Sequence, residues 1–137
     1  MRSTLAKGEK LSSQKATEFL FKNGRSFSEF PFRIIHTLAG TGNNFPAQVL
    51  ISVPKKKFKK AVDRNRIKRQ ISAAYRLNKQ ELYDQIKTLD KGLSLAIIYT
   101  STKEEPYSNI SAKIILSLQR LAKLYGQTNE LDINKNN

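Results

Sequence analysis

The sequence predicts a single α+β domain, because helical and strand-like patterns of apolar residues are mixed along one chain of 137 residues. Apolar residues recur at helical spacing in residues 12–23, 61–87 and 110–126. They alternate, or run without interruption, in residues 27–38, 45–53 and 93–100. This order indicates a small mixed sheet with helices packed on it. We expect the domain to span residues 11–126.

The composition indicates a folded and strongly basic protein. Hydrophobic residues make up 39% of the chain, which is enough for a modest core. The 25 basic and 11 acidic residues give a net charge of +14 and a pI near 10.2. Such an excess of positive charge favours a nucleic acid or an anionic membrane as partner.

Other features of the composition favour the cytoplasm. No apolar run approaches the roughly 20 residues that span a bilayer, and the N-terminus lacks the apolar core of a signal peptide. The absence of cysteine excludes disulfides and thiol chemistry and fits a reducing compartment. We therefore expect a cytoplasmic protein without a membrane partner, and no obligate protein partner is evident.

The first helix is bounded by capping residues. Ser12 or Ser13 can cap its start through a hydroxyl oxygen, and Gly24 is well placed to end it. We expect residues 1–10, which precede it, to be loosely ordered. Within the helix we expect the large aromatic ring of Phe19 to be buried.

Residues 27–38 and 45–53 are expected to form two strands of a hairpin. The turn between them, Gly40–Asn44, is rich in residues that accept positive φ. One face of the first strand carries Phe30, Phe32, Ile34, His36 and Leu38. His36 is the only histidine, so it cannot belong to a cluster of histidines that binds a metal, and we expect it to be structural.

The segment Lys55–Arg76 is the most basic part of the chain, with ten of the 25 basic residues and a single acid, Asp63. After Pro54 a lysine-rich connection leads to a helix that we expect from Ala61 to about Lys87. Its apolar row consists of Ile67, Ile71, Ala74, Tyr75 and Leu82. Its opposite side carries Asn65, Lys68, Arg69, Arg76 and Lys79. Such a helix can pack its apolar row on a core while its cations face a polyanion.

The last third of the chain supplies one strand and one helix. Residues 93–100, LSLAIIYT, are apolar on both faces, which is typical of an interior strand. A polar loop over residues 101–106 follows. The apolar residues Ile110, Ile114, Leu118, Leu121 and Tyr125 then predict a helix whose face is core and which Gly126 closes. We expect residues 127–137 to be a disordered tail.

No set of catalytic residues is visible in the sequence. The chain has one histidine, no cysteine, no glycine-rich phosphate loop and no acidic cluster that could hold Mg²⁺. Glu104 and Glu105 share a loop, whereas Glu9, Glu18 and Glu29 are scattered, and all five could be solvated surface residues.

The hexapeptide Arg64-Asn65-Arg66-Ile67-Lys68-Arg69 suits a folded RNA. Guanidinium groups bind phosphate oxygens in pairs, and the asparagine amide can bind a phosphate or a 2′-hydroxyl. Together with the lysine run and Ala61-Val62 before it, the hexapeptide resembles the signature of the bacterial ribonuclease P protein subunit. The resemblance covers residues 11–125.

The resemblance implies both a fold and a function. The implied fold is like the second domain of ribosomal protein S5, with a left-handed βαβ crossover. In ribonuclease P the RNA subunit is the catalyst, with bound Mg²⁺, and it removes the 5′ leader from precursor tRNA. The protein subunit binds that RNA and the leader, which implies no catalytic residue and no metal in this chain.

The resemblance also assigns roles to residues. The residues implied to bind the RNA subunit are Arg64, Asn65, Arg66, Lys68 and Arg69, joined by Lys55 and Lys56. The residues implied to contact the leader are Phe21, Phe32 and His36, with Ile35 as an alternative to His36. The chain departs from the family at Thr17, where an aromatic residue is usual. A second departure is the longer connection through Phe58 and Lys59, where a glycine is usual.

Two other functions fit the basic helix. A ribosomal or RNA-chaperone-type module would bind RNA without a role in tRNA processing. An autonomous nuclease would cleave precursor tRNA without any RNA subunit.

Overall fold

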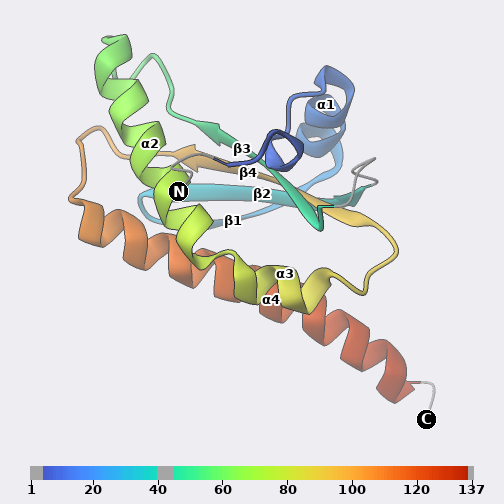
Figure 1. The fold of residues 1–137 in the computed structure, drawn as a ribbon. Helices are drawn as coiled ribbons and strands as arrows, with labels where there is room; N and C mark the ends of the chain where they lie inside the picture. The colour runs from blue at the N-terminus through green and yellow to red at the C-terminus, as the bar shows by residue number, and fades with distance from the viewer. Residues whose placement is uncertain (1–4, 40–44, 136–137) are drawn as a thin grey trace.

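The computed structural model describes residues 5–39 and 45–135, and their side chains as far as residue 126. Figure 1 shows the arrangement of the helices and strands. In chain order they are η1 (Lys7–Glu9), α1 (Gln14–Asn23), β1 (Arg25–Glu29), β2 (Phe32–Ala39), β3 (Ala47–Ser52), α2 (Ala61–Asn78), α3 (Gln80–Ile86), β4 (Gly92–Tyr99) and α4 (Tyr107–Lys135). The α+β class expected from the sequence is confirmed.

The described strands form one mixed sheet in the order β1-β2-β4-β3. β4 pairs antiparallel with β2 and parallel with β3, so it is an interior strand, as its apolar sequence predicts. The parallel pair β3 and β4 is joined by α2 and α3. The left-handed sense of this crossover stays a prediction from the resemblance.

Two expectations about the strands are wrong. Residues 27–38 are not one strand, because the chain reverses at Phe30-Pro31 and β1 pairs antiparallel with β2. Proline has no N–H to offer a ladder, which suits it to the turn. The expected hairpin between 27–38 and 45–53 does not form either, because β4 lies between β2 and β3. The expected turn at Gly40–Asn44 lies outside the described residues.

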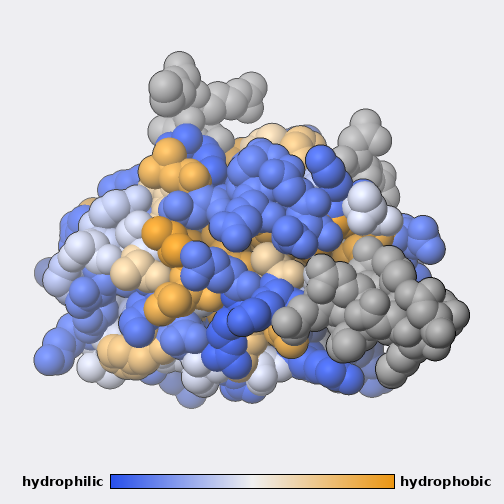
Figure 2. Space-filling model, turned by 90° about the horizontal axis from the view of Figure 1, so that it is seen from below, coloured by the Kyte–Doolittle hydropathy of each residue, from blue (hydrophilic) through white to orange (hydrophobic). Residues whose placement is uncertain are grey.

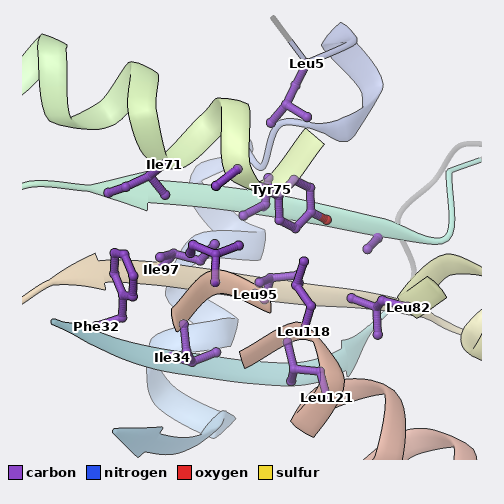
Figure 3. Close-up of a cluster of buried hydrophobic side chains, with 14 of the residues drawn as sticks. Leu5, Phe32, Ile34, Ile71, Tyr75, Leu82, Leu95, Ile97, Leu118 and Leu121 are labelled. Atoms are coloured by element: carbon purple, nitrogen blue, oxygen red, sulfur yellow. The ribbon is translucent and has the colours of Figure 1, made fainter. Parts of the chain in front are cut away.

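Helices cover both faces of the sheet, with α1 on one face and α3 and α4 on the other (Figure 1). Beneath α1, Leu11 and Leu20 pack against Ile35 and Ala96. The larger core lies on the opposite face, where apolar residues of α2, α3 and α4 meet those of the strands (Figure 3).

Helix α1 begins and ends close to where the sequence predicts. Ser13 caps it by accepting a hydrogen bond from the backbone N–H of Ala16, at 3.3 Å. Gly24 ends it with φ at −74°, so the left-handed conformation does not explain the glycine. A Cβ atom there would lie 2.4 Å from the carbonyl oxygen of Leu20 and 2.8 Å from the Ile35 side chain, so close approach requires the glycine.

Phe19 is exposed, contrary to expectation. The buried residue of α1 is Leu20, and at about 100° per residue its two neighbours point to opposite flanks of the helix. Phe19 is 46% exposed and Phe21 is 48% exposed. Both aromatic rings are therefore available on the surface.

The central helix buries the row of residues that its periodicity predicts, from Ile67 and Ile71 to Leu82. The expected single helix is divided at Lys79 into α2 and α3. The last helix already begins at Tyr107 and continues to Lys135, whereas the sequence predicts an end at Gly126. A Cβ atom at Gly126 would lie 2.8 Å from Gln85 Oε1, which is the end of a flexible side chain of α3 that can move aside. Residues 136–137 of the expected tail lie outside the described residues.

Residues 5–10 correct the expectation of a loosely ordered N-terminus, since Leu5 is buried and Lys10 forms a parallel bridge with Val49. Residues 1–4 lie outside the described part. Glu9 is buried rather than solvated, and its carboxylate accepts hydrogen bonds from Lys79 Nζ and from Tyr83 Oη at 2.7 Å. Burial alone would raise the pKa of Glu9, but the hydrogen bonds from Lys79 and Tyr83 outweigh it and lower the pKa.

No helix in the described part of the chain is both long and apolar enough to span a membrane.

Replacing Glu9 with glutamine should destabilise the fold by roughly 1–3 kcal/mol at neutral pH, because Lys79 loses its charged partner. Because folding lowers the pKa of Glu9, its carboxylate stabilises the fold fully above its ordinary pKa of 4.5. That stabilisation is lost as the pH falls through the lowered value. Urea denaturation of both proteins across this pH range should show a difference that shrinks in acid.

The exposed Glu18 on α1 provides the control, since its substitution by glutamine should change the free energy of unfolding little at any pH. A difference between wild type and Glu9→Gln that stays constant as the pH falls would contradict this account of Glu9.

Candidate RNA-binding surface

The connection before α2 and the first half of that helix form a basic ridge. It consists of Lys55, Lys56, Lys59, Lys60, Arg64, Asn65, Arg66, Lys68 and Arg69. The ridge exists because α2 turns Ile67 and Ile71 fully into the core, which leaves the polar residues between them on the surface. The structure thus brings together on one surface the residues implied to bind the RNA subunit.

The lysines of the ridge are available to a partner. Lys55, Lys56, Lys59, Lys60 and Lys68 are exposed, and none forms an ion pair with any residue that the structure describes. Such a group of unpaired like charges does not stabilise the fold, and it is suited to neutralise phosphates of a partner.

The longer connection before α2 is anchored at several points. Arg64 Nη1 donates hydrogen bonds to the carbonyl oxygens of Phe58 and Lys59, at 2.8 and 2.9 Å. The Phe58 ring packs against that of Tyr99 with a centroid distance of 5.8 Å. Lys57 Nζ donates to the carbonyl oxygen of Thr100 at 2.5 Å. Phe58, in place of the usual glycine, thus gives this connection an apolar anchor.

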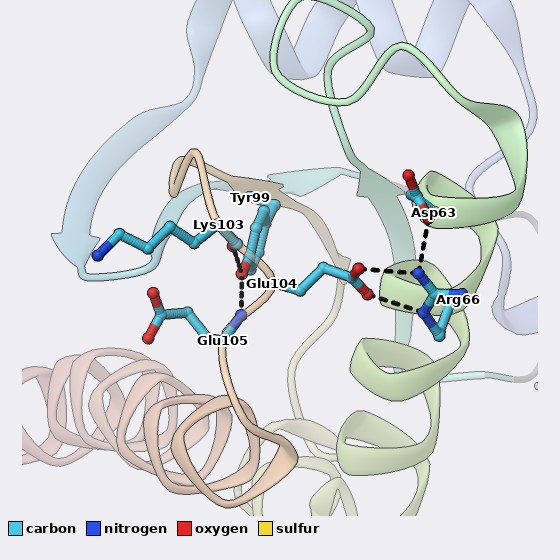
Figure 4. A network of polar contacts seen from close by, with 6 residues as sticks. All are labelled: Asp63, Arg66, Tyr99, Lys103, Glu104 and Glu105. Atoms are coloured by element: carbon cyan, nitrogen blue, oxygen red, sulfur yellow. Dashed lines mark hydrogen bonds and ion pairs between the residues drawn. The ribbon is translucent and has the colours of Figure 1, made fainter.

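Arg66 is the one arginine of the ridge with acidic partners among the described residues (Figure 4). Its Nε and Nη2 donate to the two carboxylate oxygens of Glu104, both at 2.8 Å, and Nη2 also donates to Asp63 at 2.6 Å. These hydrogen bonds raise the pKa of Arg66, and its guanidinium lowers the pKa of Glu104. The Arg66 side chain is still 42% exposed, and its Nη1 has no hydrogen-bond partner in the described part of the chain.

Glu104 is an exposed surface residue, as expected, and it is also the ion-pair partner of Arg66. The loop that carries it is fixed by Tyr99, whose hydroxyl donates to the carbonyl oxygen of Lys103 at 2.5 Å and accepts from the Glu105 N–H at 2.8 Å (Figure 4). The carboxylate of Glu104 binds Arg66 through two oxygens, which is also how a phosphate binds a guanidinium.

A groove of about 410 Å³ adjoins the basic ridge. It lies between the N-terminal segment, strand β3 and helix α2. Its apolar lining comes from Leu5, Leu11, Val49, Leu50 and Ile51, and its polar lining from Lys10, Ser12, Lys68, Arg69 and Ser72. The combination of an apolar floor and cationic walls suits a nucleotide chain.

The residues implied to contact the leader are not brought together. Phe21 is exposed on α1, whereas Phe32 is only 1% exposed and packs against Tyr99 on the opposite face of the sheet. Its assignment is wrong, because a ring buried in the core cannot stack on a base. His36 shares that face and is 5% exposed, and its Nδ1 lies 2.6 Å from Tyr125 Oη. The alternative, Ile35, lies under α1 and is also buried.

The prediction from the sequence left out two exposed residues near α1. Phe19 is a second surface aromatic on that helix, and Arg33 is exposed on the face of β2 that α1 partly covers. The alternation of β2 gave a usable signal for Arg33, since it must face away from Phe32 and Ile34. Among the described residues, no group of three or more acids or histidines could hold a metal.

The comparisons with known proteins decide the family. The family model for ribonuclease P matches residues 5–122. The chain belongs to the ribonuclease P protein family. The ribonuclease P protein component of Porphyromonas gingivalis is 31% identical over 118 residues, which cover 86% of each chain. That of Chlorobium phaeobacteroides is 36% identical over 84 residues, or 59% of this chain and 58% of the relative.

Solved structures of ribonuclease P proteins share the fold. The protein from Thermotoga maritima is 22% identical with a TM-score of 0.64, over 82% of this chain and 96% of that one. The protein from Staphylococcus aureus is 19% identical with a TM-score of 0.65, over 85% of this chain and 97% of that one. As a ribonuclease P protein, this chain is an RNA-binding subunit in tRNA processing, and the ribosomal or chaperone-type alternative is not favoured.

Replacing Glu104 with glutamine should strengthen binding to the RNA subunit roughly two- to fivefold at low salt, because a negative charge next to Arg66 is removed. The change is measured by filter-binding titration of labelled RNA. Glu81→Gln is a matched control: it changes the net charge equally but lies on α3, away from the ridge. Weaker binding by Glu104→Gln would mean that Glu104 orients Arg66 for RNA and does not compete with it.

Proposed function

We propose that this ribonuclease P protein docks on the catalytic RNA subunit through the basic ridge and assists removal of the 5′ leader from precursor tRNA in the cytoplasm. The observation that carries the proposal is the ridge itself. It presents exposed lysines of the connection and of α2 beside arginines of α2, and in the described structure only Asp63 and Glu104 pair with it. A surface of this charge is suited to RNA.

In this proposal the RNA subunit carries the catalysis, with Mg²⁺ bound mainly by the RNA. The described side chains include no converging set of carboxylates for a metal, so no step is assigned to a metal held by the protein. The protein contributes electrostatics: cations between two RNA molecules reduce their repulsion and make docking less dependent on salt. Neutralisation of about 5 phosphates would give a slope of roughly −3.5 to −4.5 for log affinity against log salt.

Phe21 is the remaining candidate for stacking on a leader base. Its ring is half exposed, and it lies on α1 where the family resemblance implies a leader contact. Lys55 and Lys56 are exposed and could bind leader phosphates or the RNA subunit. Phe32 and His36 have no part in this platform, because both are buried on the other side of the sheet.

A reconstitution assay tests the function. Precursor tRNA and Mg²⁺ are incubated at low salt with the bacterial RNA subunit, with this protein, and with both. Cleavage stimulated only by the combination is expected. Cleavage by the protein alone would indicate an autonomous nuclease, and RNA binding without stimulation would indicate a general RNA-binding module.

In filter-binding titrations at several salt concentrations, Arg64→Ala combined with Arg66→Ala should weaken binding to the RNA subunit and make the salt slope shallower by about 2, because two phosphate contacts are lost. Lys91→Ala combined with Lys123→Ala removes the same charge from exposed positions outside the ridge and should have a much smaller effect. Circular dichroism checks that both variants fold. Equal losses in the two variants would contradict a specific role for the ridge.

Phe21→Ala should reduce the affinity of the assembled enzyme for precursor tRNA by at least about fivefold, since base stacking contributes roughly 1 kcal/mol or more. The affinity for mature tRNA, which lacks the leader, should not change. Phe19→Ala is the matched control because its ring is equally exposed on the opposite flank of α1. If Phe19→Ala had the larger effect, the leader would contact that flank instead.

A further inference from the structure

A second cavity lies on the face of the sheet that α4 covers, away from the basic ridge and its groove. Its volume is about 540 Å³, which is in the range of small-ligand sites. The cavity, here called the β1–α4 pocket, is lined by residues of β1, the end of β2 and α4, together with Asn23 at the end of α1, and none comes from α2. Figure 2 shows the molecule from below, where hydrophilic side chains surround scattered hydrophobic ones.

Two arginines supply positive charge to the β1–α4 pocket. Arg25 is exposed, and its side chain has no hydrogen bond or ion pair with any residue that the structure describes. Arg120 stacks on the Phe27 ring with its guanidinium carbon 4.0 Å from the centroid. Its Nη1 donates to Glu29 at 3.1 Å and to the Ser28 carbonyl oxygen at 3.5 Å, whereas Nε and Nη2 have no partner among the described residues. Glu29 therefore balances one of the two charges.

His36 and Tyr125 form the inner wall of the pocket. The T-shaped packing of their rings and the 2.6 Å contact from Nδ1 to Oη fix both side chains. Arg25 is the cross-strand neighbour of His36 in the β1–β2 ladder. The pKa of His36 is lowered by burial and then by the charges of Arg25 and Arg120, so the field at the imidazole is positive. Burial raises the pKa of the Tyr125 hydroxyl to about 12, so it remains a hydrogen-bond donor at neutral pH.

We propose that the β1–α4 pocket binds a phosphate group of a single-stranded RNA nucleotide, with Arg25 and Arg120 on the phosphate and the apolar walls against the base. Two guanidinium groups with free donors at one half-enclosed cavity are the chemistry that recognises a phosphate. Phe27, Leu38 and Tyr125 give the cavity the apolar and aromatic lining that a base requires. The inference that the phosphate belongs to RNA rests on the proposed function. The inference that the pocket binds a phosphate rests on the pocket alone.

The single histidine of the chain makes the test direct, because the imidazole signals in a ¹H–¹³C NMR spectrum can come only from His36. The whole protein is titrated with adenosine, adenosine monophosphate, inorganic phosphate and a short single-stranded RNA. A bound phosphate offsets the positive field of the arginines, so adenosine monophosphate and the short RNA should both raise the pKa of His36. Adenosine, which lacks the phosphate, should not raise it.

Arg25→Gln supplies the matched variant. It should raise the pKa of His36 in the free protein and weaken binding of adenosine monophosphate roughly tenfold. Arg33→Gln is the control, since Arg33 is an exposed arginine on the opposite face of β2 and should leave both quantities unchanged.

Three results would overturn the proposal: no change in the His36 signals with adenosine monophosphate, an equal response to adenosine, or an undiminished response in Arg25→Gln. A response to inorganic phosphate without one to the RNA would refute RNA as the source. The titration contains no catalytic RNA, so its outcome does not depend on whether the reconstitution assay succeeds.

Discussion

The burial of the apolar row of α2 determines where the charge of this protein lies. Ile67, Ile71, Ala74 and Tyr75 are completely buried, and each isoleucine contributes about 2–3 kcal/mol by leaving water. That burial fixes the rotation of the helix about its axis. The arginines and lysines between those residues then have no position except the surface. The affinity for a polyanion therefore follows from the same packing that stabilises the domain.

The ridge is also ordered before any partner arrives. The lysines of the connection repel one another and would extend a free loop. Here the ring of Phe58, the hydrogen bonds of Arg64 and the contact between Lys57 and Thr100 hold that connection against the end of β4. Binding of a partner therefore costs little free energy for ordering this segment. The Glu104 carboxylate, placed by the loop that Tyr99 fixes, gives Arg66 a second constraint of the same kind.

The features that local periodicity encodes could be predicted from the sequence. The buried row of α2, the interior position of β4 and the basic motif were all readable from spacing alone. The strand order was not, because β4 enters between β2 and β3 from far along the chain. The role of Glu9 was hidden for the same reason, since Lys79 and Tyr83 lie 70 and 74 residues away. The side-chain faces of β2 were predictable, but the burial of Phe32 depends on α4 and Tyr99.

The sheet separates two chemically different sides of the molecule. On one side, α1 leaves Phe19 and Phe21 exposed above a small apolar cluster. On the other, β1 extends beside α4, and the positively charged β1–α4 pocket opens there. His36 illustrates the separation: its position in β2 directs it to the α4 side, among the arginines, and away from the aromatic residues of α1. A strand that alternates between two functional faces can serve both of them, but no single residue in it can.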